Sequence, residues 1–168
     1  ARRKNKINSD YKINMAHIHE KIDFTVTCFI LHPSEPKVLL IHHKAHNSWL
    51  PVGGHIELDE DPDQALLREV EEECGLGIEI FSEKSPGEYP ETKMLRRPDT
   101  VDIHTINDAG HRHVNFGYSA RALSAEPKLA PEEHHDIKWF SAEELRDENL
   151  NIKPAIRDYA LGFLKKFG

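Results

Sequence analysis

The chain has 168 residues, of which 38% are hydrophobic and 30% charged, a balance too apolar for a disordered protein and too polar for a membrane protein. Its formal net charge of −7 argues against a groove that follows a nucleic-acid backbone, and its two cysteines form no CxxC pair. No apolar run approaches the roughly 20 residues of a membrane-spanning helix. We therefore expect a cytoplasmic protein with neither a nucleic-acid nor a membrane partner.

The first 14 residues, ARRKNKINSDYKIN, carry a net charge of +4 and lack the apolar centre of a secretory signal. We expect residues 1–14 to be a basic N-terminal arm, or vector-derived sequence ahead of a native start at Met15. We expect residues 15–168 to form a single domain, because a chain of this length fits one hydrophobic core.

The order of predicted elements is typical of an α/β fold with a mixed sheet between helices. β-Branched and aromatic residues predict strands at 24–31, 38–42, 78–81, 101–106, 113–122 and 137–140, the first two forming a hairpin. Helices are predicted at about 62–74, after Ser141, and from Pro154 onward. Residues 43–61 and 84–100 are predicted as mostly irregular, and a loop as long as the second is often functional.

The helix predicted at about 62–74 has two unlike faces. It begins with a capping-box pattern at Asp61 and Gln64, and its apolar residues recur at helical spacing on the side that faces the core. On another side Glu69, Glu72 and Glu73 fall within an arc of about 100°. A bare run of glutamates is typical of a solvated helix face. Three carboxylates so close together would also suit Mg²⁺ or Mn²⁺, which prefer oxygen ligands.

The residues around these glutamates decide between the two interpretations. Residues 54–76 fill the pattern G-x5-E-x7-R-E-U-x-E-E-x-G-U, with U aliphatic, without a departure. At common residue frequencies a chance match is rarer than about one in a million. This pattern is the Nudix box, and the chain resembles the Nudix hydrolase family. Residues 49–54 and 139–145 match that family more loosely, with Val52 where proline is usual.

The resemblance covers roughly residues 22–150 and implies an α/β/α sandwich with a mixed β-sheet. It also implies Mg²⁺- or Mn²⁺-dependent hydrolysis of the pyrophosphate bond in a nucleoside diphosphate linked to another moiety. Nucleoside triphosphates and nucleotide sugars or ADP-ribose are favoured over dinucleoside polyphosphates. A non-catalytic nucleotide-binding sensor on the same fold is the alternative, which the three intact glutamates disfavour. Dimers are common in the family, so a homodimer is a further expectation.

Site residues follow from their positions in the family's motif. Glu69 would act as the base that deprotonates water, Arg68 would orient it, and Glu60 would support the loop before the helix. The implied metal ligands are the Gly53 carbonyl, Glu69, Glu72, Glu73 and a late-loop carboxylate, for which Glu133 is chosen over Glu132 and Asp136. Allylic diphosphate isomerisation on the same fold would need a catalytic cysteine, for which Cys28 and Cys74 are poorly placed.

Twelve histidines are many for this length, and His55, beside the glycine pair, is the best candidate to line a substrate cleft. Trp49 and Tyr89, on predicted loops, are the candidates to stack on a base. His111 and His113 would share one face of an extended segment. No third ligand at a fixed spacing supports a histidine metal site there.

Overall fold

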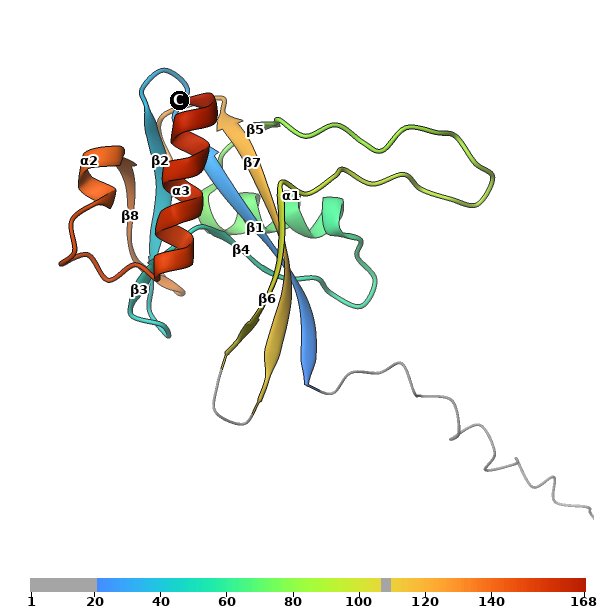
Figure 1. The fold of residues 1–168 in the computed structure, drawn as a ribbon, viewed down its shortest axis with the longest axis horizontal. Helices are drawn as coiled ribbons and strands as arrows, with labels where there is room; N and C mark the ends of the chain where they lie inside the picture. The colour runs from blue at the N-terminus through green and yellow to red at the C-terminus, as the bar shows by residue number, and fades with distance from the viewer. Residues whose placement is uncertain (1–20, 107–109) are drawn as a thin grey trace, which may run out of the picture.

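The computed structural model describes residues 21–106 and 110–168, so the predicted arm at 1–14 lies outside the described residues. The described chain forms an eight-stranded sheet with helices on both faces. In Figure 1, α3 (Pro154–Phe167) lies in front of the sheet and α1 (Pro62–Cys74) behind it. The predicted α/β/α sandwich is confirmed.

The remaining elements are one short helix and the strands of the sheet. The helix is α2 (Ala142–Leu145), which directly follows the last strand. The strands are β1 (Ile22–Leu31), β2 (Lys37–His43), β3 (Ser48–Leu50), β4 (Val52–His55), β5 (Ile78–Ile80), β6 (Thr100–Thr105), β7 (Arg112–Ala122) and β8 (His134–Ser141).

The central strand β1 makes the sheet mixed. It pairs in parallel with β7 along its whole length, from Ile22 opposite Arg112 to Leu31 opposite Arg121. On its other edge it pairs antiparallel with β4 and then with β2. The outer strands β3 and β8 pair antiparallel with β2, and β5 and β6 pair antiparallel with β7.

Two hydrophobic clusters fill the space between the sheet and its helices. Because successive side chains of a strand point to opposite faces, β1 contributes to both clusters. Val26 and Cys28 pack with α1 residues such as Leu66, whereas Phe29 packs with Phe163 of α3. Each helix is thereby fixed to one face, and α1 is held with its glutamates beside β4.

Residues 43–61 are mostly irregular, as predicted, but they also contain the two short strands β3 and β4, which were not predicted. Glycines have low strand propensity, but pairing with β1 overrides it. Gly53 approaches β1 so closely that a Cβ on it would lie 2.1 Å from the carbonyl oxygen of Val26. The last strand also begins earlier than predicted, at His134 instead of residue 137.

The predicted long irregular segment is confirmed, and it projects from the body as an arm of residues 82–99 (Figure 1). Its two sides meet through a hydrogen bond from the Ser85 N–H to the Leu95 carbonyl, 2.9 Å long. The N–H of Arg96 donates to the carboxylate of Asp63 at 3.2 Å. The base of the arm is therefore attached to the first turn of α1.

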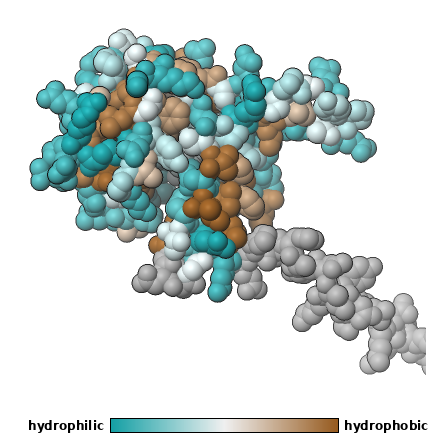
Figure 2. Space-filling view, viewed as in Figure 1, coloured by the Kyte–Doolittle hydropathy of each residue, from teal (hydrophilic) through white to brown (hydrophobic). Residues whose placement is uncertain are grey.

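Exposed apolar side chains gather over the part of the sheet that holds β6 (Figure 2). Phe24, Val101 and Ile103 are each about half exposed. Among the described helices, none is long and apolar enough to cross a bilayer.

Candidate functional site

Local sequence fixes where α1 begins and ends. The carboxylate of Asp61 accepts from the N–H groups of Asp63 and Gln64, and the Gln64 side chain accepts from the N–H of Asp61. Pro62 occupies the first turn, where a missing N–H costs nothing. Gly75 ends the helix at φ 59°, a left-handed conformation that suits glycine. The predicted capping box is confirmed.

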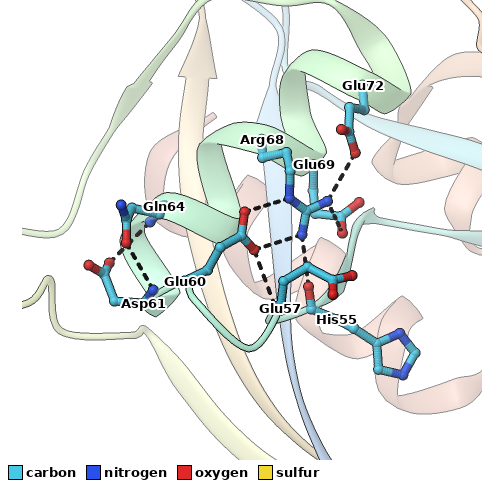
Figure 3. A network of polar contacts seen from close by, with 8 residues as sticks. All are labelled: His55, Glu57, Glu60, Asp61, Gln64, Arg68, Glu69 and Glu72. Atoms are coloured by element: carbon cyan, nitrogen blue, oxygen red, sulfur yellow. Dashed lines mark hydrogen bonds and ion pairs between the residues drawn. The ribbon is translucent and has the colours of Figure 1, made fainter.

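Arg68 is the centre of the site, as Figure 3 shows. Its guanidinium donates to both carboxylate oxygens of Glu60, at 2.6 and 2.9 Å. It also donates to Glu69 at 2.8 Å and to Glu72 at 2.9 Å. A further bond of 2.9 Å reaches the backbone carbonyl of His55 at the end of β4. One side chain therefore joins the loop before α1, two glutamates of α1, and the sheet.

The third glutamate, Glu73, makes no contact with Arg68 among the hydrogen bonds described and is almost fully buried. One of its carboxylate oxygens accepts from the N–H of Gly53 at 2.7 Å. The other lies 3.1 Å from Nε2 of His134, a buried side chain on β8. Ligand atoms of Glu73, Glu133 and His134 all lie within 4.8 Å of one another. The structure thus brings the late-loop carboxylate Glu133 next to Glu73.

The electrostatics of α1 fit a divalent cation. Burial raises the pKa of Glu69 to about 7; Arg68 opposes this shift, whereas Glu73 and Glu72 add to it. Burial first, and then the neighbouring glutamates, therefore disfavour ionisation of Glu69 even with Arg68 beside it. Glu72 remains open to solvent, with 59% of its side chain exposed. Clustered carboxylate oxygens with one open side are the donor set that Mg²⁺ prefers.

Two of the predicted substrate-binding residues lie away from this network. Trp49 belongs to β3 and packs edge-on against Phe140, with ring centroids 4.8 Å apart, in the cluster under α3. Its prediction as a loop residue is therefore wrong. Tyr89 lies in the arm of residues 82–99, where it pairs with Thr92.

His55, in contrast, lines a groove beside the site. The groove has a volume of about 620 Å³ and runs between β1 and the loop before α1. Phe24 and Phe116 contribute two rings to its wall, stacked with centroids 6.2 Å apart. A base or other flat group could contact these rings while its phosphates reach α1.

Sequence reasoning missed His134, which lies against Glu73. The ligands expected from the late loop were carboxylates, and the last strand was expected to begin at residue 137. In the structure His134 pairs in register with His43 of β2, which buries its ring beside α1. The doublet of His134 and His135 next to an acidic run could have marked this position.

A second cluster joins Asp23, His55, His111 and His113. Nε2 of His111 lies 3.2 Å from both Oδ2 of Asp23 and Nε2 of His113. Nε2 of His55 lies 3.6 Å from the same oxygen of Asp23. Burial, and then the neighbouring imidazoles, lower the pKa of His113 to about 4. The sequence offers His111 and His113 no third ligand at a fixed spacing, but the sheet brings two further donor side chains, Asp23 and His55, from other strands.

Both cysteines are buried, and neither thiol is reactive at neutral pH. Burial raises the pKa of the Cys74 thiol to about 11 and that of the Cys28 thiol further. A thiol that stays protonated is a poor nucleophile and a poor proton donor at neutral pH. This state disfavours isomerisation chemistry that needs a catalytic cysteine.

Comparison with known proteins gives consistent matches. A family model described as NUDIX domain matches residues 21–159. The structure resembles that of a NUDIX-family hydrolase from Clostridium perfringens, with a TM-score of 0.74, 32% identity, and coverage of 87% of this chain and 98% of that chain. It also resembles a MutT NUDIX hydrolase from Burkholderia pseudomallei, with a TM-score of 0.63, 25% identity, and coverage of 85% and 98%.

A curated relative from Lactococcus lactis subsp. cremoris is named "Probable DHNTP pyrophosphohydrolase". It is 30% identical over 96 residues, which are 57% of this chain and 53% of the relative. The chain thus matches about half the length of this curated relative.

Proposed function

The chain belongs to the NUDIX domain family, and from this premise we propose that it is a pyrophosphohydrolase dependent on Mg²⁺ or Mn²⁺. Its substrate is a nucleoside diphosphate linked to another moiety, and the reaction cleaves the P–O–P bond. The observation that carries this proposal is the arrangement around Arg68, whose guanidinium joins the half-buried Glu69 to the exposed Glu72.

Within that class, a nucleoside triphosphate or a similar triphosphate is the favoured substrate. The name of one relative, a probable DHNTP pyrophosphohydrolase, supports this choice. The aromatic wall of the groove beside His55 offers a place for the flat ring system of such a compound. Nucleotide sugars and ADP-ribose are the second choice.

The groups that would hold the metal are the Gly53 carbonyl and the carboxylates of Glu69, Glu72, Glu73 and Glu133. A bound divalent ion neutralises phosphate charge and lowers the pKa of a bound water. His134 lies against Glu73 and would act as a positioning residue for that carboxylate. The N–H of Gly53 holds the other oxygen of Glu73, so this ligand is fixed before metal binds.

Glu69 is the proposed general base. In the metal-free protein burial raises the pKa of Glu69 to about 7, so this carboxylate accepts a proton more readily than an exposed glutamate does. Arg68 fixes the direction of this carboxylate, and Glu60 in turn fixes Arg68. When the water oxygen bonds to phosphorus, the bridging P–O bond breaks and the water proton passes to Glu69. Two phosphate-bearing products leave.

The test is release of phosphate-bearing products from a small panel in Mg²⁺. The panel holds several nucleoside triphosphates, dihydroneopterin triphosphate, ADP-ribose, a nucleotide sugar and a dinucleoside polyphosphate. Turnover of one class by the wild type, lost in Glu69→Gln, is the expected result. Saturable binding of one compound without turnover would overturn the hydrolase assignment and favour a sensor module.

A further inference from the structure

Four side chains that belong to neither α1 nor the late loop meet where β1 and β7 begin and β4 ends. They are Asp23 of β1, His55 of β4, His111 just before β7, and His113 of β7. We propose that these four residues bind one divalent transition-metal ion, best fitted by Zn²⁺, at a site separate from the α1 carboxylates.

The spacing of the donor atoms matches a tetrahedral zinc site. Zinc bonds to nitrogen and oxygen are about 2.0–2.1 Å long, so neighbouring donors of a tetrahedron lie about 3.3–3.4 Å apart. Nε2 of His111 lies 3.2 Å from Oδ2 of Asp23 and 3.2 Å from Nε2 of His113. Nε2 of His55 lies 3.6 Å from Oδ2 of Asp23. All four donor atoms lie within 4.8 Å of one another. Small side-chain movements would complete the tetrahedron.

Strand pairing in the sheet brings these donor side chains together. Asp23 is paired with His113 across the parallel strands β1 and β7. His55 is paired with Thr25, which lies two residues along β1 from Asp23 and therefore on the same face. Neighbouring side chains on one face of a sheet lie close enough to share a ligand.

The chemistry of the donors separates this site from α1. Three imidazoles and one carboxylate suit zinc and its neighbours in the first transition row, whereas Mg²⁺ takes oxygen ligands almost alone. The carboxylates of Glu69 and Glu72 form the opposite kind of set. Excess Mg²⁺ should therefore occupy α1 without displacing zinc from the histidines.

His55 connects the two sites. Its carbonyl accepts a bond from Arg68, while its ring points away from that network (Figure 3). A metal bound to the ring would tie β4 to β1 and β7. It would thereby fix the backbone group on which Arg68 depends.

The experiment uses the full chain, stripped with a chelator and returned to excess Mg²⁺. Zn²⁺ affinity and stoichiometry are measured by competition with a chromogenic chelator, and Co²⁺ absorption reports the coordination number. We expect one Zn²⁺ per chain, and a four-coordinate Co²⁺ spectrum. In His113→Ala the affinity for Zn²⁺ should fall by more than roughly 100-fold. A smaller loss is expected for a residue that only contacts a metal ligand.

Two control variants locate the ion. His135→Ala removes an exposed histidine on β8, and Glu72→Gln alters the α1 carboxylates; both should keep the zinc affinity of the wild type. Thermal unfolding shows that each variant is folded, and Zn²⁺ should raise the melting temperature of the wild type but not of His113→Ala. Absence of zinc binding in excess Mg²⁺, unchanged binding in His113→Ala, or its loss in Glu72→Gln would overturn the proposal.

Discussion

At the scale of single residues, two adjacent glycines serve different ends. A Cβ on Gly54 would lie 2.3 Å from a carboxylate oxygen of Glu69, at the movable end of a side chain. A Cβ on Gly53 would meet the backbone of β1, and Gly53 also has a φ of +150°. The missing side chain at Gly54 therefore leaves room for the Glu69 carboxylate. The missing side chain at Gly53 lets β4 pair closely with β1.

This difference predicts opposite results for two alanine variants. Gly54→Ala should displace the Glu69 carboxylate and lower kcat by about 100-fold, with little change in the free energy of unfolding. Gly53→Ala should lower that free energy by about 2 kcal/mol or more, since the β1–β4 pairing must shift. Steady-state kinetics and urea denaturation of both variants check this. Equal loss of stability in the two variants would contradict the separation.

Glu69 predicts a pH dependence of Mg²⁺ binding. Burial raises its pKa from 4.5 to about 7, so in the metal-free folded protein this group keeps its proton over a range where the unfolded chain has lost it. Its contribution to stability is present below about pH 4.5 and is lost as the pH rises to about 7. Mg²⁺ must displace that proton at low pH but not at high pH.

The melting temperature should therefore rise more on adding Mg²⁺ at pH 8 than at pH 6. In Glu69→Gln the increments at the two pH values should become alike. If Mg²⁺ raises the melting temperature of the wild type equally at pH 6 and pH 8, a proton on Glu69 does not compete with metal binding.

The motif predicted that Arg68, Glu69 and Glu72 lie close together on α1, because helical periodicity alone brings these positions near one another. It could not predict Asp23 or His134. Asp23 reaches His111 through the parallel pairing of β1 and β7, and His134 reaches Glu73 through the register of β8 on β2. Contacts set by pairing between distant strands leave no local signal in one sequence.

At the scale of elements, the start of α1 decides where the glutamates point. Asp61→Ala removes the acceptor for two N–H groups of the first turn and should lower the free energy of unfolding by about 1 kcal/mol. Asp61→Asn keeps a capping side chain but loses the carboxylate that pairs with Lys93, so it isolates the cap. Urea denaturation should place Asp61→Asn close to the wild type. Equal losses in the two variants would assign the effect to the Lys93 pair.

Some strands could be predicted from the sequence and others could not. The strands β1, β2, β6 and β7 were found because their own residues favour extended structure. The short strands β3 and β4 were not, since Pro51 and the glycine pair interrupt the strand-forming residues of WLPVGG. Pairing with β2 and β1 makes this segment extended. Strand β4 nevertheless carries Gly53, Gly54 and His55, so the site depends on an element that only the folded chain defines.

At the scale of the whole molecule, charge and architecture agree with a cation-dependent reaction. The chain has a net charge of −7, and the proposed substrate class is also anionic. An acidic body can accept a polyphosphate only where cations lie between carboxylate and phosphate. The homodimer expected from the resemblance stays a prediction.

We propose above that the carboxylates bound by Arg68 are needed for Mg²⁺-dependent hydrolysis. The most direct measurement compares kcat of Glu72→Gln and Glu71→Gln on the substrate found in the panel. Both residues are exposed on α1, but only Glu72 is bound by Arg68. Glu72→Gln should lose roughly 100-fold or more in kcat, while Glu71→Gln stays near the wild type. Near-normal turnover by Glu72→Gln would contradict the account.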